Sequence, residues 1–129
     1  MSTRVAITGA GAISPVGLTS SESWDSIKNG KLGISKIKSF DSSNLSVHIA
    51  AEVKGFNPED ILGKKDSRRL DRFSQFACVA AMEALEMSGL DIESLDPTRF
   101  SSIVGSGVGG IMTLSDQFVD NLHVLVFNW

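Results

Sequence analysis

Hydrophobic positions recur along this chain in two patterns, short continuous runs and longer runs with a helical period. Residues 4–8 and 101–104 are short runs rich in β-branched side chains, and each leads into a glycine-rich loop. Such a run predicts a buried strand whose end carries a site. Residues 47–53 predict a third strand, whereas residues 33–40 alternate only weakly and predict irregular structure.

The helical period is clearest over residues 70–87, which contain no glycine or proline before Gly89. Apolar side chains recur there at steps of three and four, and many are alanines, so we expect a helix that packs closely inside a larger body. Three shorter helices are expected: residues 22–28 after a cap at Ser20 or Ser21, a segment that opens at residues 57–60 with Pro58 in its first turn, and residues 110–122. The alternation of strands and helices predicts an α/β fold without an internal domain boundary.

Composition narrows the functional classes. The 129 residues, 42% hydrophobic and 21% charged, fit one globular domain. The net charge of −3 argues against a nucleic-acid partner, and no apolar run approaches the roughly 20 residues of a membrane helix. The single cysteine excludes an internal disulfide, and the amino terminus lacks the pattern of a signal peptide. We therefore expect a cytoplasmic protein without membrane contact.

The end of the chain differs from the rest. Residues 124–129 read Val-Leu-Val-Phe-Asn-Trp, without a turn or a charged end. Natural domains seldom expose so many apolar side chains together. We therefore divide the chain into residues 1–123 and an atypical apolar tail at 124–129, which either docks on the core or is foreign to the remainder.

Both glycine-rich loops are candidates for a nucleotide-binding site. Residues 105–110 have the spacing G-x-G-x-x-G after a predicted strand. A dinucleotide fingerprint also needs a second strand that ends in an acidic residue about 20 positions later, and a helical pattern follows instead. In the loop at residues 9–17, Ser14-Pro15 replaces the third glycine. Sharp turns and close backbone packing are the favoured interpretation of both loops, with a small nucleotide-binding oxidoreductase as the weakest alternative.

No catalytic or metal-binding set is evident in the chain. Cys78 lies on the small apolar face of the long predicted helix, and no histidine nearby in sequence would lower the pKa of its thiol. We interpret it as a buried structural thiol. His48 and His123 do not have metal-ligand spacing with it. We therefore assign no catalytic residue, metal or cofactor to this chain.

Residues 64–72 form the sharpest electrostatic feature, with five basic and two acidic side chains in an otherwise acidic chain. In a continuous helix, Lys65, Arg68, Arg69 and Arg72 would share one side. The segment is either the solvated start of a helix or a surface for an acidic partner, phosphate groups or an acidic helix. Basic residues at a helix amino terminus oppose the macrodipole, and a partner would justify that cost.

Together these segments resemble the elongating β-ketoacyl-acyl-carrier-protein synthases over residues 3–123. The shared motifs, in the family's order, are Val5–Gly17, Trp24, Gly30, Gly33-Ile34, Phe40-Asp41, Phe56-Asn57, Lys65–Phe73 and Gly105–Gly110. The resemblance implies a thiolase-like fold, of which this chain supplies the incomplete first half of a layered α/β/α/β/α body. It also implies a homodimeric acyltransferase of fatty-acid biosynthesis.

The reaction implied by the resemblance is a decarboxylative Claisen condensation of an acyl thioester with malonyl-carrier protein. By the same likeness Lys65, Arg68 and Arg69 dock the acyl-carrier protein, and Val108 is the gate of the acyl pocket. The family's catalytic cysteine, histidines and lysine lie beyond residue 129, after a Gly-Pro-containing segment that is absent here. The chain is therefore expected to be an inactive fragment. The alternative is a non-catalytic module that binds carrier protein.

Overall fold

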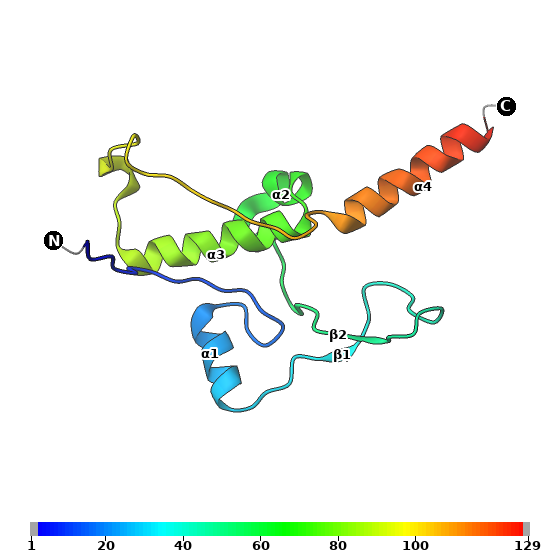
Figure 1. Cartoon of the computed structure of the whole chain (residues 1–129), viewed down its shortest axis with the longest axis horizontal. Coiled ribbons are helices and arrows are strands. Elements are labelled where there is room, and N and C mark those ends of the chain that lie inside the picture. The colour runs from blue at the N-terminus through cyan, green and yellow to red at the C-terminus, as the bar shows by residue number, and fades with distance from the viewer. Residues whose placement is uncertain (1–2, 128–129) are drawn as a thin grey trace.

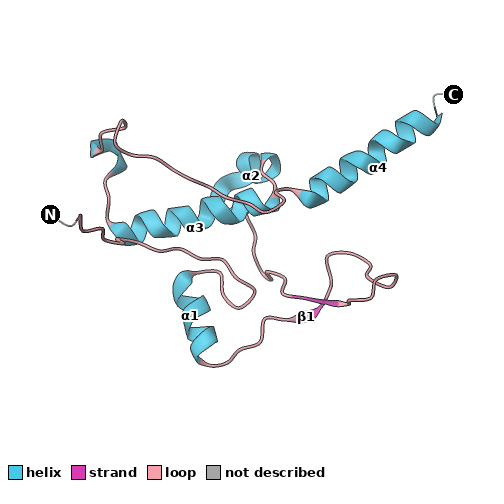
Figure 2. Ribbon diagram, viewed as in Figure 1, coloured by secondary structure: helices cyan, strands magenta, loops and turns pink. Residues whose placement is uncertain are grey.

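The computed structural model describes residues 3–127 of the chain, with side chains up to Val119. Helix α3 forms its centre, the amino-terminal segment runs along α3, and α4 projects away from the other elements (Figure 1). Long loops join the elements (Figure 2). The elements in chain order are α1 (Ser20–Lys28), β1 (Ser35–Lys36), β2 (Ile49–Ala50), α2 (Glu59–Arg69), α3 (Arg72–Ser88), the 3-10 turn η1 (Ile92–Ser94) and α4 (Ile111–Phe127).

The predicted long helix is confirmed as α3, with a start two residues later than expected. Leu70 is extended at φ −99° and ψ 133°, and Asp71 occupies the N-cap position, so α2 and α3 are separate helices. Gly89 ends α3 in the left-handed conformation at φ 64°, which glycine adopts without a steric cost. The break before Asp71 therefore divides the basic segment between two helices.

The shorter helices are also confirmed, with shifted boundaries. The cap of α1 is Thr19, whose hydroxyl accepts a hydrogen bond from the Glu22 amide at 3.1 Å. Neither expected cap is used: Ser20 and Ser21 are the first residues of the helix, and Ser20 donates to Glu83. Pro58 stands at the N-cap of α2 rather than within its first turn, and α2 is interrupted at Gly63, whose φ of 75° and ψ of 162° are not helical. Helix α4 begins at Ile111, just after the expected start at residue 110, and its backbone continues to Phe127, beyond the expected end at residue 122.

The strands are the part of the fold that the sequence predicts least well. A two-stranded antiparallel sheet pairs Ser35 with Ala50 and Lys36 with Ile49. Strand β2 occupies only the centre of the predicted strand at residues 47–53, and β1 lies in the segment predicted to be irregular. Strand formation depends on a pairing partner as well as on the pattern of one segment.

The two predicted buried strands at residues 4–8 and 101–104 are wrong for this structure. Both segments lack strand pairing among the described residues, and their apolar side chains are open, with Val5 90% and Ile103 95% exposed. An apolar β-branched run becomes a strand only when a neighbouring strand satisfies its backbone groups. The described residues thus form helices and one small antiparallel sheet, an incomplete α/β arrangement.

The amino-terminal loop packs closely on α3, which confirms the structural interpretation of its glycines. A Cβ atom at Gly9 would overlap the Ala84 carbonyl oxygen, and one at Gly11 would overlap that of Ala80. The loop and the helix therefore meet backbone to backbone, and the alanines of α3 permit that approach. This is the close packing that the alanine-rich pattern predicts.

Glu83 of α3 fixes the same loop through hydrogen bonds. One carboxylate oxygen accepts the Ala12 amide at 2.9 Å, and the other accepts the amide and the hydroxyl of Ser20, each at 2.7 Å. Burial raises the pKa of Glu83, but the hydrogen bonds from Ser20 and Ala12 outweigh it, so the pKa lies below its usual value. Glu83 is therefore ionised at neutral pH, where charge strengthens these bonds.

Apolar packing elsewhere is sparse. Phe56 and Val79 are the buried apolar side chains of the described residues, and the Phe56 ring meets the edge of Phe76 with centroids 5.0 Å apart. None of the helices in the described part of the chain is long and apolar enough to cross a membrane. The side chains of the predicted tail at residues 124–129 lie outside those that the structure describes, so that division stays a prediction.

Replacing Gly11 by alanine should lower the free energy of unfolding by about 1–3 kcal/mol, because the new methyl group must displace backbone of α3. Urea unfolding of the purified chain measures the loss. Gly105→Ala is the matched control, since a Cβ there meets nothing within 4 Å, and its effect should stay within about 0.5 kcal/mol. Equal losses for the two variants would contradict the packing argument.

Candidate functional site

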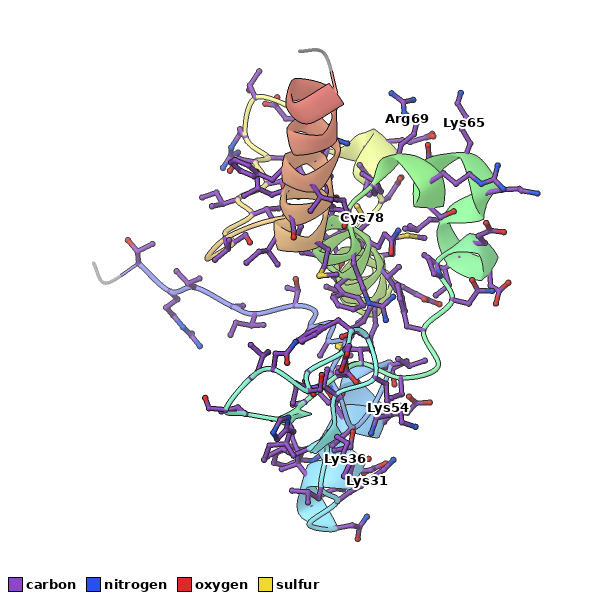
Figure 3. All side chains as sticks on the ribbon, turned by 90° about the vertical axis from the view of Figure 1, so that its right-hand side faces the viewer. Lys31, Lys36, Lys54, Lys65, Arg69 and Cys78 are labelled. Carbon is purple, nitrogen blue, oxygen red and sulfur yellow. The ribbon has the colours of Figure 1, made fainter. Side chains whose placement is uncertain are left out.

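The cationic face of α2, defined as Lys65, Arg68 and Arg69, is open to solvent. Lys65 and Arg69 point outward from the same helix (Figure 3). Arg68 is paired loosely with Glu59, with 3.9 Å between Nε and Oε1, and its side chain remains 67% exposed. The three predicted docking residues are thus brought together, and a partner can reach them without a rearrangement of the helix.

The helix boundaries correct one argument for this face. The basic segment was expected at a helix amino terminus, where it would oppose the macrodipole. Arg68 and Arg69 instead lie in the last turn of α2, where the macrodipole favours basic side chains. The non-helical Gly63 divides α2, so Lys65 lies just after a break and keeps the expected placement near a helix start. The exposure of the cations therefore marks the face as a candidate interface.

Arg72 does not belong to the cationic face, contrary to the expected sharing of one helical side. It is the first residue of α3, and its guanidinium carbon lies 4.9 Å from the ring centroid of Phe76 and 5.6 Å from that of Phe56. Its Nη2 donates to the Val53 carbonyl at 3.2 Å. Arg72 therefore joins the segment after β2 to α3, because the break at Leu70 turns it away from α2.

A groove of about 590 Å³ separates α2 from α3. Cys78 lines it and is half-buried, whereas the sequence predicts a buried thiol. The walls are otherwise mainly apolar, with two charged side chains at the edge: Leu62, Leu70, Ala81, Met82 and Leu85, with Asp66 and Arg69. The thiol can thus be reached from solvent next to the cationic face.

The structure does not build an acyl-transfer site around Cys78. His48 lies before β2, and its Nδ1 is 3.4 Å from the Ser42 hydroxyl, so its partner is a loop serine. The side chain of His123 lies outside those described. Among the described residues, no three histidine, cysteine or acidic side chains cluster closely enough to hold a metal ion.

The loop at residues 105–110 carries Val108, whose side chain is 71% exposed. The amide of Gly109 donates to the Ser106 hydroxyl at 2.9 Å, and Gly109 has a φ of 76°, a conformation that favours glycine. A Cβ at Gly110 would overlap the Asp71 carboxylate, whereas Gly105 and Gly107 have open surroundings. Close packing is therefore confirmed at the end of this loop and is wrong for its start.

A second group of cations, not suggested by the sequence, consists of Lys31, Lys36 and Lys54. Figure 3 shows them far from Lys65 and Arg69. They come from three separate segments, so no local charge pattern indicates them. Lys31 and Lys54 line a hollow of about 560 Å³ that also contains the carboxylates of Glu22 and Asp25. That mixture of charge distinguishes it from the cationic face of α2.

Comparisons with known proteins place this chain in a family. The family model for the beta-ketoacyl synthase N-terminal domain matches residues 2–125. The chain is 46% identical over 110 residues to 3-oxoacyl-[acyl-carrier-protein] synthase 2 of Staphylococcus aureus (strain COL), covering 85% of this chain and 27% of that protein. The protein of the same name from Vibrio cholerae is 43% identical over 108 residues, which are 84% of this chain and 26% of that protein.

A solved structure supports the fold. The ishigamide ketosynthase/chain length factor superposes with a TM-score of 0.76 at 24% identity, over 92% of this chain and 29% of that chain. The expected thiolase-like fold is thus confirmed as an incomplete α/β domain. The chain spans about a quarter of the length of the curated relatives that it matches.

Arg72→Met should lower the free energy of unfolding by about 1 kcal/mol, because it removes the contacts with both rings and with the Val53 carbonyl. The matched variant Arg69→Met removes the same charge from the exposed end of α2 and should cost less than about 0.5 kcal/mol. Urea unfolding of both variants measures the difference. If Arg69→Met costs as much as Arg72→Met, the division of the basic segment into two roles is wrong.

Proposed function

Because this chain belongs to the β-ketoacyl synthase family, we propose that it is the amino-terminal part of a 3-oxoacyl-acyl-carrier-protein synthase of fatty-acid biosynthesis. The whole enzyme would take an acyl group onto a cysteine, and the carbanion left by decarboxylation of malonyl-carrier protein would attack that thioester. The family match over residues 2–125 carries the proposal. The exposed cationic face of α2 adds a surface suited to an acidic partner.

The proposed partner at Lys65, Arg68 and Arg69 is the acyl-carrier protein. Exposed ion pairs contribute under about 1 kcal/mol each, so three of them do not account for a tight complex by themselves. Several cations on one helix instead steer an acidic protein toward its docking position and raise the association rate. The chain as a whole has a net charge of −3, so its overall charge does not attract an acidic protein, and the attraction has to come from a local group of cations such as this face.

Val108 is proposed as the gate of the acyl pocket. Its exposed side chain, in a glycine-rich loop beside the start of α3, supports contact with an apolar chain that a docked partner delivers. The open apolar segments at residues 4–8 and 101–104 support a larger body, which we propose to be a cytoplasmic homodimer. Residues 1–123 would belong to that body, with residues 124–129 as the atypical tail.

A non-catalytic module that binds carrier protein is the second candidate. The observation that favours it is the cationic face of α2, which is complete within this chain, whereas no catalytic set forms among the described residues. The two candidates differ in what a longer chain would add: the enzyme needs a nucleophile and histidines from beyond residue 129, and the module needs none.

The 129-residue chain should form no acyl-enzyme when it is incubated with acyl-carrier protein. No described histidine stands beside Cys78 to activate its thiol, so nucleophilic transfer lacks its base. Intact-mass spectrometry measures the acylated fraction, with Cys78→Ser as the control for non-specific labelling. Stable acylation that depends on Cys78 and is followed by turnover would contradict the proposal.

Charge reversal on the cationic face should slow binding of the carrier protein. The suitable protein is a hybrid enzyme in which residues 2–125 replace the matching segment of the Staphylococcus aureus relative. Arg68→Glu with Arg69→Glu should lower the association rate most at low ionic strength, where screening is weakest. Stopped-flow binding at several salt concentrations, with the melting temperature of each variant, measures the effect.

The control is Lys36→Glu with Lys54→Glu, which changes the net charge equally on a distant surface (Figure 3). It should alter the association rate much less. Equal slowing by the two pairs would mean that net charge alone acts. An unchanged rate after reversal of Arg68 and Arg69, with the fold intact, would contradict the docking role.

A further inference from the structure

Asp71 has an unusual arrangement for its position. It stands at the N-cap of α3, where an aspartate side chain commonly accepts a hydrogen bond from the first turn of its own helix. Its side chain makes no such bond here. The carboxylate instead accepts the hydroxyl of Thr113, 42 positions later, in the first turn of α4.

The same carboxylate lies against Gly110, where no Cβ atom would fit. A negative charge beside the amino terminus of α4 is also favoured by the helix macrodipole. The Phe73 ring lies near Gly109, since a Cβ atom built there would be 3.7 Å from it. Two side chains from the start of α3 therefore hold the loop at the end where α4 begins.

Val108 lies just before this anchored end. The opposite end of the loop is open, because Gly105 and Gly107 have nothing close around them. The position of Val108 thus depends on the contacts that Asp71 and Phe73 make one and two residues beyond it.

Asp71 is also connected to the cationic face of α2. Only Leu70 separates it from Arg69, and the buried Gln75 side chain donates to the Ser67 carbonyl at 2.7 Å and to the Leu70 carbonyl at 3.0 Å. The end of α2, the residue Leu70 and the start of α3 are therefore tied into one junction. A partner that binds Arg69 is placed relative to that junction.

We propose that Asp71 is a positioning residue: by anchoring the loop at residues 105–110 to the α2–α3 junction, it sets the place of Val108 relative to the cationic face. This inference rests on the proposed function, in which a partner docked on α2 delivers an acyl chain past Val108. An acyl chain that is bound correctly but meets a displaced gate reacts slowly, since small errors in position lower the rate of the reaction. The anchor therefore acts on the reaction of the bound partner and not on its binding.

The test uses the hybrid enzyme with Asp71→Ala and with Thr113→Val, which break the same hydrogen bond from its two ends. Thr113→Ser keeps the hydroxyl and is the matched control. Amide hydrogen exchange over residues 105–113 is compared with that of α3. Loss of a hydrogen bond to a charged group predicts roughly tenfold faster exchange of the loop amides in both variants, with α3 unchanged and with Thr113→Ser close to the parent.

Steady-state kinetics with acyl-carrier thioesters give the second measurement. Asp71→Ala and Thr113→Val should each lower kcat by roughly tenfold and leave KM for the carrier thioester unchanged. The double variant should be no slower than Asp71→Ala alone, because Thr113 has no carboxylate to bind once Asp71 is replaced. Thr113→Ser should restore the parent kcat, which a general loss of packing would not permit.

Three outcomes would overturn the proposal. They are unchanged loop exchange in Thr113→Val, equally faster exchange throughout α3, and a raised KM with an unchanged kcat. Thr113→Val leaves α3 intact, so it decides the question even if Asp71→Ala fails to fold. If reversal of Arg68 and Arg69 leaves carrier binding unchanged, the docking proposal fails on its own, and the exchange measurement still decides whether Asp71 anchors the loop.

Discussion

The backbone contact between the amino-terminal loop and α3 is the constraint on which the rest of this structure depends. Gly9 and Gly11 leave no room for a side chain against the carbonyl groups of Ala84 and Ala80. Glu83 then binds Ala12 and Ser20 from the same helix face. Since the buried apolar set of the described residues is so small, polar contacts and close backbone packing carry an unusual share of the stabilisation. Helix α3 thereby becomes the scaffold for the amino-terminal loop at one end and for the α2 junction at the other.

The start of α3 shows how one residue divides a charged sequence into different roles. Leu70 is extended, so the cations before it belong to α2 and face solvent. The residues after it turn inward: Asp71 toward α4, Arg72 toward Phe56 and Phe76, and Gln75 toward the end of α2. A continuous helix would have placed Arg72 with the cations of α2. The proposed docking surface and the residues that support it are therefore adjacent in the chain but separate in space.

Elements whose hydrogen bonds lie within one segment were predictable from the sequence. Elements that depend on contacts with distant segments were not. The period and the alanines of α3 were sufficient because helix hydrogen bonds are internal. The runs at residues 4–8 and 101–104 predict strands, but a strand needs a neighbour, and their side chains stay open here. The proposed docking residues followed from likeness to a family, and the structure adds that they are exposed. The link from Asp71 to Thr113 gives no local signal, because 42 positions separate the two residues.

The electrostatics of α2 leave its cations available to a partner. Arg68 and Arg69 lie in the last turn, where basic side chains match the macrodipole, although the non-helical Gly63 divides the helix before Lys65. Arg68 is only partly neutralised, since its side chain stays 67% exposed beside Glu59. Because the Debye length is about 8 Å at physiological salt, such charges act mainly over the final approach of a partner. In the function that we propose, the junction at Leu70 then determines where that partner stands relative to Val108.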